Sequence, residues 1–117
     1  MRNMDYYNKH RWRLTHGYSE TDNYLMEELV DTEWSKEFEQ LMRNRLIMGS
    51  FRYGRLGDKN KPNYDRVFSI LNRLIAYYYH SNKEHLVDIA NLCMCEFVEG
   101  YGHFESIDDG EHVKIIK

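Results

Sequence analysis

The strongest constraint on the fold is the spacing of apolar residues between residues 63 and 80. At about 100° per residue, a helix over this segment has one broad apolar side and one polar side. The apolar set is Val67, Phe68, Ile70, Leu71, Leu74, Ile75, Tyr77 and Tyr78. The polar set is Asp65, Arg66, Ser69, Asn72, Arg73 and His80. This pattern predicts an amphipathic helix that buries its apolar side.

A second segment with helical spacing follows almost directly. Residues 83–99 repeat the pattern, and Gly100 is well placed to end a helix. Ser81 and Glu84 have the spacing of a capping box, in which each side chain binds a backbone N–H of the other residue. Because the connection is short, the helices at 63–80 and 83–99 are expected to be antiparallel neighbours.

Two more helices are expected earlier in the chain. The first covers about Asp22 to Val30, and the second begins near Asp31 or Thr32 and ends at Gly49 or Gly54. The sequence therefore predicts an all-α fold, a four-helix, bundle-like single domain with an irregular C-terminal tail.

The single domain divides into three parts in this interpretation. Residues 1–20 form an N-terminal arm, residues 21–99 the helical core and residues 100–117 the tail. Within the tail, residues 113–116 are expected to form a short strand or an extended piece against the bundle.

Charge and hydropathy exclude several classes of protein. The 117 residues carry a net charge of −3, so no overall positive field draws the protein onto nucleic acid or acidic lipid. No apolar run is long enough to span a bilayer, and no secretory signal is seen at the start, so we expect a soluble, cytoplasmic protein without a membrane partner. Cys93, expected to be buried, and Cys95 are two residues apart on a helix and are not expected to form a disulfide.

The N-terminal arm is the one basic stretch. Its basic residues alternate with aromatic ones, a composition that suits binding to phosphates and stacking on bases. These residues are Arg2, Tyr6, Tyr7, Lys9, Arg11, Trp12 and Arg13. The alternative is an arm whose rings pack against the bundle.

Three residues of the last helix form the main candidate metal site. Glu84, Asp88 and Asn91 lie along one line of the helix at spacings of four and three. Oxygen ligands in such a row can hold Mg²⁺ when another helix supplies a further carboxylate. The alternative is that they are polar residues on the outer side of an amphipathic helix. The metal candidates are Glu84 and Asp88.

A second candidate site lies on the neighbouring helix. Arg66, Arg73 and His80 are seven residues apart and therefore lie along one side. Arg66 and Arg73, together with Asn91, are candidates for binding the phosphates of a nucleotide. Alternatively, the arginines pair with acidic residues of the adjacent helix.

The order of three short motifs resembles a known family. Arg52-Tyr-Gly54, Arg73-Leu74 and Leu86-Val-Asp-Ile-Ala-Asn91 are ordered and separated as in small phage-encoded relatives of the MazG-like all-α nucleoside triphosphate pyrophosphohydrolases. The resemblance covers about residues 33–99.

The resemblance implies what a metal site would contain. Active members bind Mg²⁺ and a nucleoside triphosphate through two paired acidic motifs. Asp88 matches the aspartate of the second motif, but His85 stands where its glutamate would be, and Glu84 is displaced by one position. The first motif has no clean match, so the implied metal motif is degenerate. Relatives of this kind also imply a homo-oligomer.

Three functions follow as hypotheses. The first is a non-catalytic helical binding module of phage or mobile-element type, acting on a nucleotide or on a host protein, for example as an anti-defence or anti-CRISPR inhibitor. Its expected interaction surface is Glu84, His85, Asp88 and Glu96, together with the tail. The alternatives are a Mg²⁺-dependent nucleoside triphosphate pyrophosphohydrolase, whose only cofactor would be Mg²⁺, and a nucleic-acid binder that uses the N-terminal arm. No catalytic residue is identified.

Overall fold

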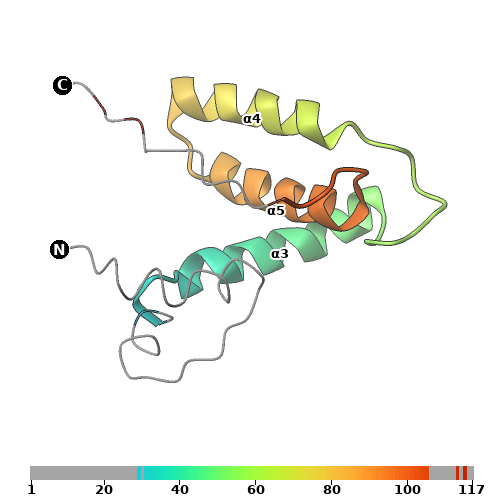
Figure 1. Ribbon diagram of the computed structural model, residues 1–117, viewed down its shortest axis with the longest axis horizontal. Coiled ribbons are helices and arrows are strands. Elements are labelled where there is room, and N and C mark those ends of the chain that lie inside the picture. The colour runs from blue at the N-terminus through green and yellow to red at the C-terminus, as the bar shows by residue number, and fades with distance from the viewer. Residues whose placement is uncertain (1–28, 30, 106–112, 114, 116–117) are drawn as a thin grey trace. The chain divides into compact units, whose positions relative to one another are not determined.

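The fold is defined by a computed structural model that describes residues 29, 31–105, 113 and 115. Residues 34–102 form one unit that contains three helices, α3 (Lys36–Tyr53), α4 (Arg66–His80) and α5 (Glu84–Glu99). Helix α5 lies between α3 and α4 and packs against both (Figure 1).

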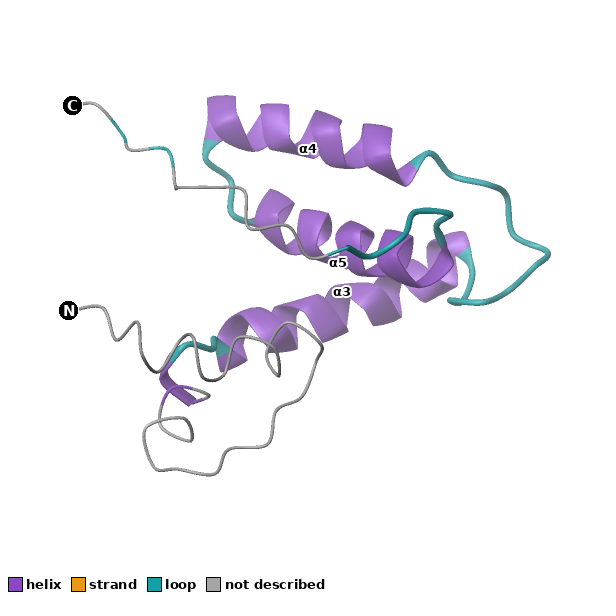
Figure 2. Cartoon of the chain, in the orientation of Figure 1, coloured by secondary structure: helices purple, strands orange, loops and turns teal. Residues whose placement is uncertain are grey.

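The all-helical prediction is confirmed for the part of the chain that the structure describes, where only helices and irregular segments occur (Figure 2). The expected first helix, residues 22–30, lies outside the described residues apart from Leu29. The expected N-terminal arm, residues 1–20, also lies outside them.

Capping interactions explain where α3 begins. The hydroxyl of Ser35 accepts a hydrogen bond from the backbone N–H of Phe38 at 3.1 Å, so Ser35 is the N-cap. The predicted start at Asp31 or Thr32 is wrong for this helix, because residues 34 and 35 are not helical. At the other end, Gly54 is the C-cap. Of the two predicted ends, Gly49 and Gly54, the second is confirmed.

Gly54 has a backbone conformation that other residues rarely adopt, with φ at 96° and ψ at 159°. A Cβ added there would approach the Cβ of Lys61 to 3.0 Å. We therefore expect Gly54→Ala to lower the free energy of unfolding by about 2 kcal/mol. Urea denaturation measures the loss. Gly102→Ala is the control, since nothing lies within 4 Å of its added Cβ, and an equal loss in both variants would contradict the expectation.

The carboxylate of Asp65 begins α4 by accepting a hydrogen bond from the N–H of Phe68 at 3.0 Å. The predicted start near Asn63 is therefore too early. Ser81 adopts a left-handed conformation with φ at 56°, and its N–H donates to Tyr77 O at 2.8 Å, which ends the helix.

The predicted capping box of Ser81 and Glu84 is wrong. Ser81 closes α4, and the side chain of Asn82 accepts a hydrogen bond from the Glu84 N–H at 3.0 Å. The short connection still has the predicted consequence, since α4 and α5 are neighbours and run in opposite directions (Figure 1).

Helix α4 directs its two arginines toward α5, and most of the apolar side that was predicted to be buried is exposed. Of that apolar side, only Ile70 and Tyr77 are partly buried. The side chain of Arg66 is 15% exposed, whereas Phe68 and Ile75 are 59% and 57% exposed. The reason is electrostatic: acidic side chains on α5 bind the arginines of α4 and so orient the helix. Among the described residues, only Val87 and Asn91 are fully buried.

Two smaller predictions concern the cysteines and the tail. Both cysteines are free, as expected, but Cys93 is exposed rather than buried because the side of α5 that carries it is covered by neither neighbour. In the tail, Val113 and Ile115 are in no strand and are largely exposed. Of the helices that the structure describes, none combines the length and hydropathy needed to cross a membrane.

Candidate functional site

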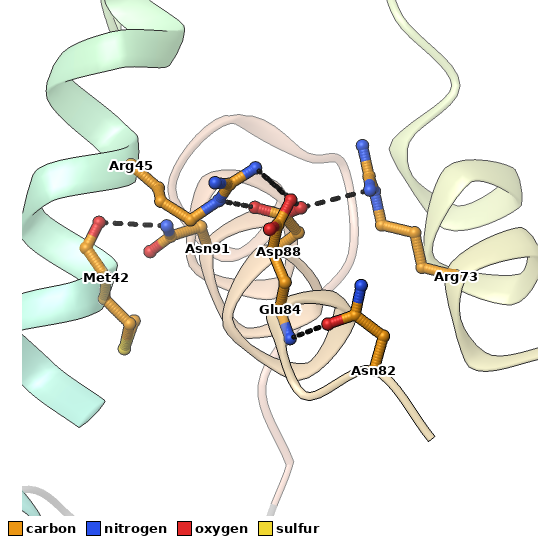
Figure 3. A network of polar contacts seen from close by, with 7 residues as sticks. All are labelled: Met42, Arg45, Arg73, Asn82, Glu84, Asp88 and Asn91. Carbon is orange, nitrogen blue, oxygen red and sulfur yellow. Dashed lines mark hydrogen bonds and ion pairs between the residues drawn. The ribbon is translucent and has the colours of Figure 1, made fainter. Parts of the chain in front are cut away.

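The carboxylate of Asp88 is the centre of a polar network that joins all three helices (Figure 3). Its Oδ1 accepts a hydrogen bond from Arg45 Nε at 2.5 Å, and its Oδ2 accepts one from Arg45 Nη2 at 3.2 Å. From the opposite side, Arg73 Nη1 donates to Oδ2 at 3.1 Å. The Asp88 side chain is only 13% exposed. One carboxylate of α5 therefore holds an arginine from α3 and an arginine from α4.

Arg45 contacts a second carboxylate of α5. Its Nη2 lies 3.1 Å from Glu84 Oε1. The hydrogen bond from Arg45 to Asp88 raises the pKa of the Arg45 guanidinium above its usual value. The Glu84 side chain is 57% exposed, so most of this second contact is open to solvent. Because Arg45 binds both oxygens of Asp88, it fixes the Asp88 carboxylate in orientation as well as in position.

Asn91 continues the row one turn further along α5. Its Nδ2 donates a hydrogen bond to the backbone oxygen of Met42 at 3.0 Å. Its Oδ1 is buried and has no hydrogen-bond partner among the described residues. The row of Glu84, Asp88 and Asn91 that the sequence placed on one line thus contacts α3 at every step (Figure 3).

The arrangement around Asp88 is that of an ion-pair centre. Two guanidinium groups occupy the positions around its oxygens that a cation would take. Over the described residues, no group of three or more His, Cys, Asp or Glu side chains is arranged to hold a metal ion. The assignment of Glu84 and Asp88 as Mg²⁺ ligands stays a prediction, and Mg²⁺ would compete with Arg45 and Arg73 for the oxygens of Asp88.

A second network lies at the far end of α5, around Glu99. Its carboxylate accepts hydrogen bonds from Arg66, from Lys61 Nζ at 3.1 Å and from the backbone N–H of Gly57 at 2.8 Å. Glu96 lies 3.7 Å from Arg66 and adds a weaker contact. This network attaches the loop between α3 and α4 to the end of α5.

The Glu99 network gives the stability a pH dependence. The hydrogen bond from the Gly57 N–H, followed by the bond from Lys61, lowers the pKa of Glu99 below its ordinary value of 4.5. Because the unfolded chain then takes up the proton more readily, the contribution of Glu99 to stability is complete above 4.5 and is lost as the pH falls through the lowered pKa.

We therefore expect the free energy of unfolding to fall less steeply on acidification in Glu99→Gln than in the unchanged chain. Urea denaturation at a series of acidic pH values measures both slopes. Part of the slope remains in the variant, because hydrogen bonds from Trp34 and Arg43 also lower the pKa of Glu39. Equal slopes would contradict the role of Glu99.

The structure separates the residues proposed for phosphate binding. Arg73 binds Asp88, Arg66 binds Glu99 and Glu96, and Asn91 binds the Met42 backbone. Pairing of these arginines with acidic residues of the adjacent helix, the alternative left open by the sequence, is what the structure shows.

Sequence reasoning missed Arg45 as a member of the site. It lies at an apolar position in the helical spacing of α3, between Met42 and Met48, and a charged residue at such a position signals a buried partner. Lys61 and Glu99 were missed as well, and no motif identifies them, because the loop brings Lys61 to α5 from 38 residues away.

The expected interaction surface is largely occupied by these ion pairs. Asp88 is 13% exposed, Glu96 is 37% exposed and Glu84 is 57% exposed, and all three contact arginines. His85 is partly buried, and its Nδ1 has no hydrogen-bond partner among the described residues.

A groove of about 580 Å³ lies between α3 and the beginning of α5. We call it the α3 groove. Its lining is mainly apolar and includes charged side chains. The apolar lining consists of Phe38, Leu41, Met48, Leu86 and Val87, and the polar lining of Ser35, Glu37, Asn44, Arg45, Lys83 and Glu84. Met48 is 56% exposed and Leu41 is 42% exposed, so part of the lining faces solvent.

Comparisons of the chain with protein-family models, with curated proteins and with solved structures find no match.

Proposed function

We propose that this chain is a non-catalytic helical module that binds another protein through the α3 groove. The groove carries the proposal, because its volume of about 580 Å³ lies within the usual range for binding sites and its lining combines apolar with charged side chains. The ligand that suits it is an amphipathic segment of a target protein that inserts apolar side chains between Leu41 and Met48.

The charges at the groove support a protein target over a nucleotide. Arg45 is bound to Asp88 and Glu84, so its positive charge is already balanced. The lining also contains Glu37, Lys83 and Glu84, which give no net positive field for a triphosphate. Apolar side chains on a partly exposed surface with a polar edge are typical of protein-binding sites.

The network at Asp88 supports a non-catalytic role. A carboxylate that activates water through Mg²⁺ has to offer its oxygens to the metal. Both oxygens of Asp88 are instead bound to arginines of two different helices, which makes Asp88 a structural connection between α3, α4 and α5.

We propose a host protein as the target and a phage or mobile-element origin, in keeping with the resemblance to small phage-encoded proteins, and an anti-defence inhibitor is one such role. We also propose a cytoplasmic location and a fourth helix over residues 22–30.

Photo-cross-linking tests the binding site. A photoreactive phenylalanine analogue replaces Met48, the full chain is irradiated in host-cell lysate, and the cross-linked protein is identified and purified. Its affinity for the unchanged chain is then measured by calorimetry. We expect Met48→Glu to weaken binding at least tenfold, because the carboxylate would be placed in the apolar groove.

Tyr101→Glu is the matched control, because this aromatic residue is fully exposed and lies outside the groove. Its affinity should equal that of the unchanged chain. Equal affinity of Met48→Glu and the unchanged chain would exclude the groove as the binding site. Magnesium-dependent release of pyrophosphate from a nucleoside triphosphate, lost in Asp88→Ala, would exclude a non-catalytic role.

A further inference from the structure

Helix α4 carries an apolar stripe on the side that faces away from α5. Val67, Leu71, Leu74 and Tyr78 follow one another at spacings of four, three and four residues. They are 53%, 51%, 45% and 80% exposed, respectively. We call these four residues the α4 seam. The spacing is that of alternating d and a positions in a heptad, the positions that meet in the core of a coiled coil.

The surroundings of the α4 seam are apolar as well. Phe68, Ile75 and Tyr79 lie beside it and are 59%, 57% and 74% exposed. The charged residues of α4, Arg66 and Arg73, project to the other side, where they bind carboxylates of α5. The outer side of α4 is therefore broad and apolar and carries no charged side chain.

We propose that the α4 seam binds the α4 seam of a second copy of this chain, in an antiparallel pair related by twofold symmetry. The spacing of four, three and four reads the same from both ends of the helix. In an antiparallel pair, Val67 therefore lies opposite Tyr78 of the second copy, and Leu71 lies opposite Leu74. A twofold interface requires a surface that is complementary to itself in this way.

The absence of charge distinguishes the α4 seam from the α3 groove. Charged side chains lose hydration when an interface forms unless each finds a partner, whereas two uncharged apolar stripes meet without that cost. Permanent interfaces between identical chains are also more apolar than transient ones and resemble a divided protein core. The α3 groove has Glu37, Lys83 and Glu84 in its lining and suits a transient partner.

The area available agrees with a stable dimer. A whole aromatic side chain offers about 150–250 Å², and an aliphatic one offers less. At exposed fractions between 45% and 80%, the seven exposed apolar side chains of α4 present roughly 800 Å² per copy, the usual contribution of one partner to a stable interface. Among the described residues, Val87 is the one apolar side chain that is fully buried, so much of the apolar surface in this part of the chain is open to a further contact. A second copy is present whenever the chain is made.

Sedimentation equilibrium of the full chain tests the proposal. We expect a mass of twice 14.3 kDa that persists at high salt, because apolar contacts are not screened by ions. Leu71→Glu should give a mass of one chain, since it places two carboxylates at the centre of the interface. Ile47→Glu is the matched control, an exposed position on α3 that should leave the dimer intact.

A second measurement uses the unchanged chain and therefore does not require any variant to fold. In a sample that mixes isotope-labelled and unlabelled full chains, an isotope-filtered nuclear Overhauser experiment detects only contacts between copies. We expect contacts between Leu71 methyl groups of one copy and Leu74 methyl groups of the other. A single-chain mass at all concentrations, or a dimer whose contacts between copies come from other helices, would overturn the proposal. Neither result depends on whether the α3 groove binds a target.

Discussion

Asp88→Ala is expected to lower the free energy of unfolding by about 2–3 kcal/mol, at a fixed chain concentration. Removing one partner of a buried ion pair typically costs about 3–5 kcal/mol, because the other charge is left unpaired. Here Asp88 is 13% exposed, but Arg45 and Arg73 are 32% and 39% exposed. Solvent screens the two unpaired guanidiniums in part, so the loss is smaller than for a fully buried pair.

Glu84→Ala is the control for this variant, measured by the same urea denaturation. Glu84 contacts Arg45 on the same line of α5, but its side chain is 57% exposed. Exposed ion pairs contribute at most about 1 kcal/mol, so the loss should stay within that value. If Asp88→Ala cost no more than Glu84→Ala, Asp88 would not be the residue that connects the helices.

Asn91→Asp is expected to have an effect of similar size, about 3 kcal/mol at neutral pH. The change keeps the shape of the side chain but removes the amide that donates to Met42 O and introduces a negative charge at a position that is 7% exposed. Burial and the neighbouring carbonyl oxygen raise the pKa of the new carboxyl group in the folded state. The loss should therefore be complete at neutral pH and shrink as the pH falls through that raised pKa.

Asn91→Ala separates the charge from the lost hydrogen bond. It also loses the bond to Met42 O but introduces no charge, so we expect a smaller loss of about 1–2 kcal/mol that does not depend on the protonation of residue 91. Urea denaturation at neutral and acidic pH compares the two variants. A penalty in Asn91→Asp that fails to shrink on acidification would show that residue 91 is not held against a carbonyl oxygen.

Helices α4 and α5 could be predicted because each carries a regular apolar pattern, and their antiparallel arrangement followed from the short connection. The exact first residues of these helices were less predictable, because several adjacent polar residues could act as caps. In the structure the capping side chains are those of Asp65 and Asn82. The row from Glu84 to Asn91 was also recognised as a unit from its spacing. The partner of that row could not be predicted, because Arg45 lies 43 residues away from Asp88 in the chain.

The orientation of α4 could not be predicted from its amphipathic pattern. The rule that an apolar side faces inward assumes that the other elements of the unit are apolar where they meet the helix. Helix α5 instead presents Asp88 and Glu99 to α4, and these carboxylates bind Arg73 and Arg66. The pattern of α4 is still informative, because the apolar side that α5 leaves exposed is the surface that we propose for a second copy of the chain.

A double-mutant cycle between Arg45 and Asp88 tests most directly whether Asp88 is a structural ion-pair centre. Urea denaturation of the unchanged chain, Arg45→Ala, Asp88→Ala and the double variant is carried out with and without Mg²⁺. We predict a coupling free energy of about 1–3 kcal/mol that Mg²⁺ leaves unchanged. A coupling near zero, or stabilisation by Mg²⁺ that disappears in Asp88→Ala, would contradict this structural role.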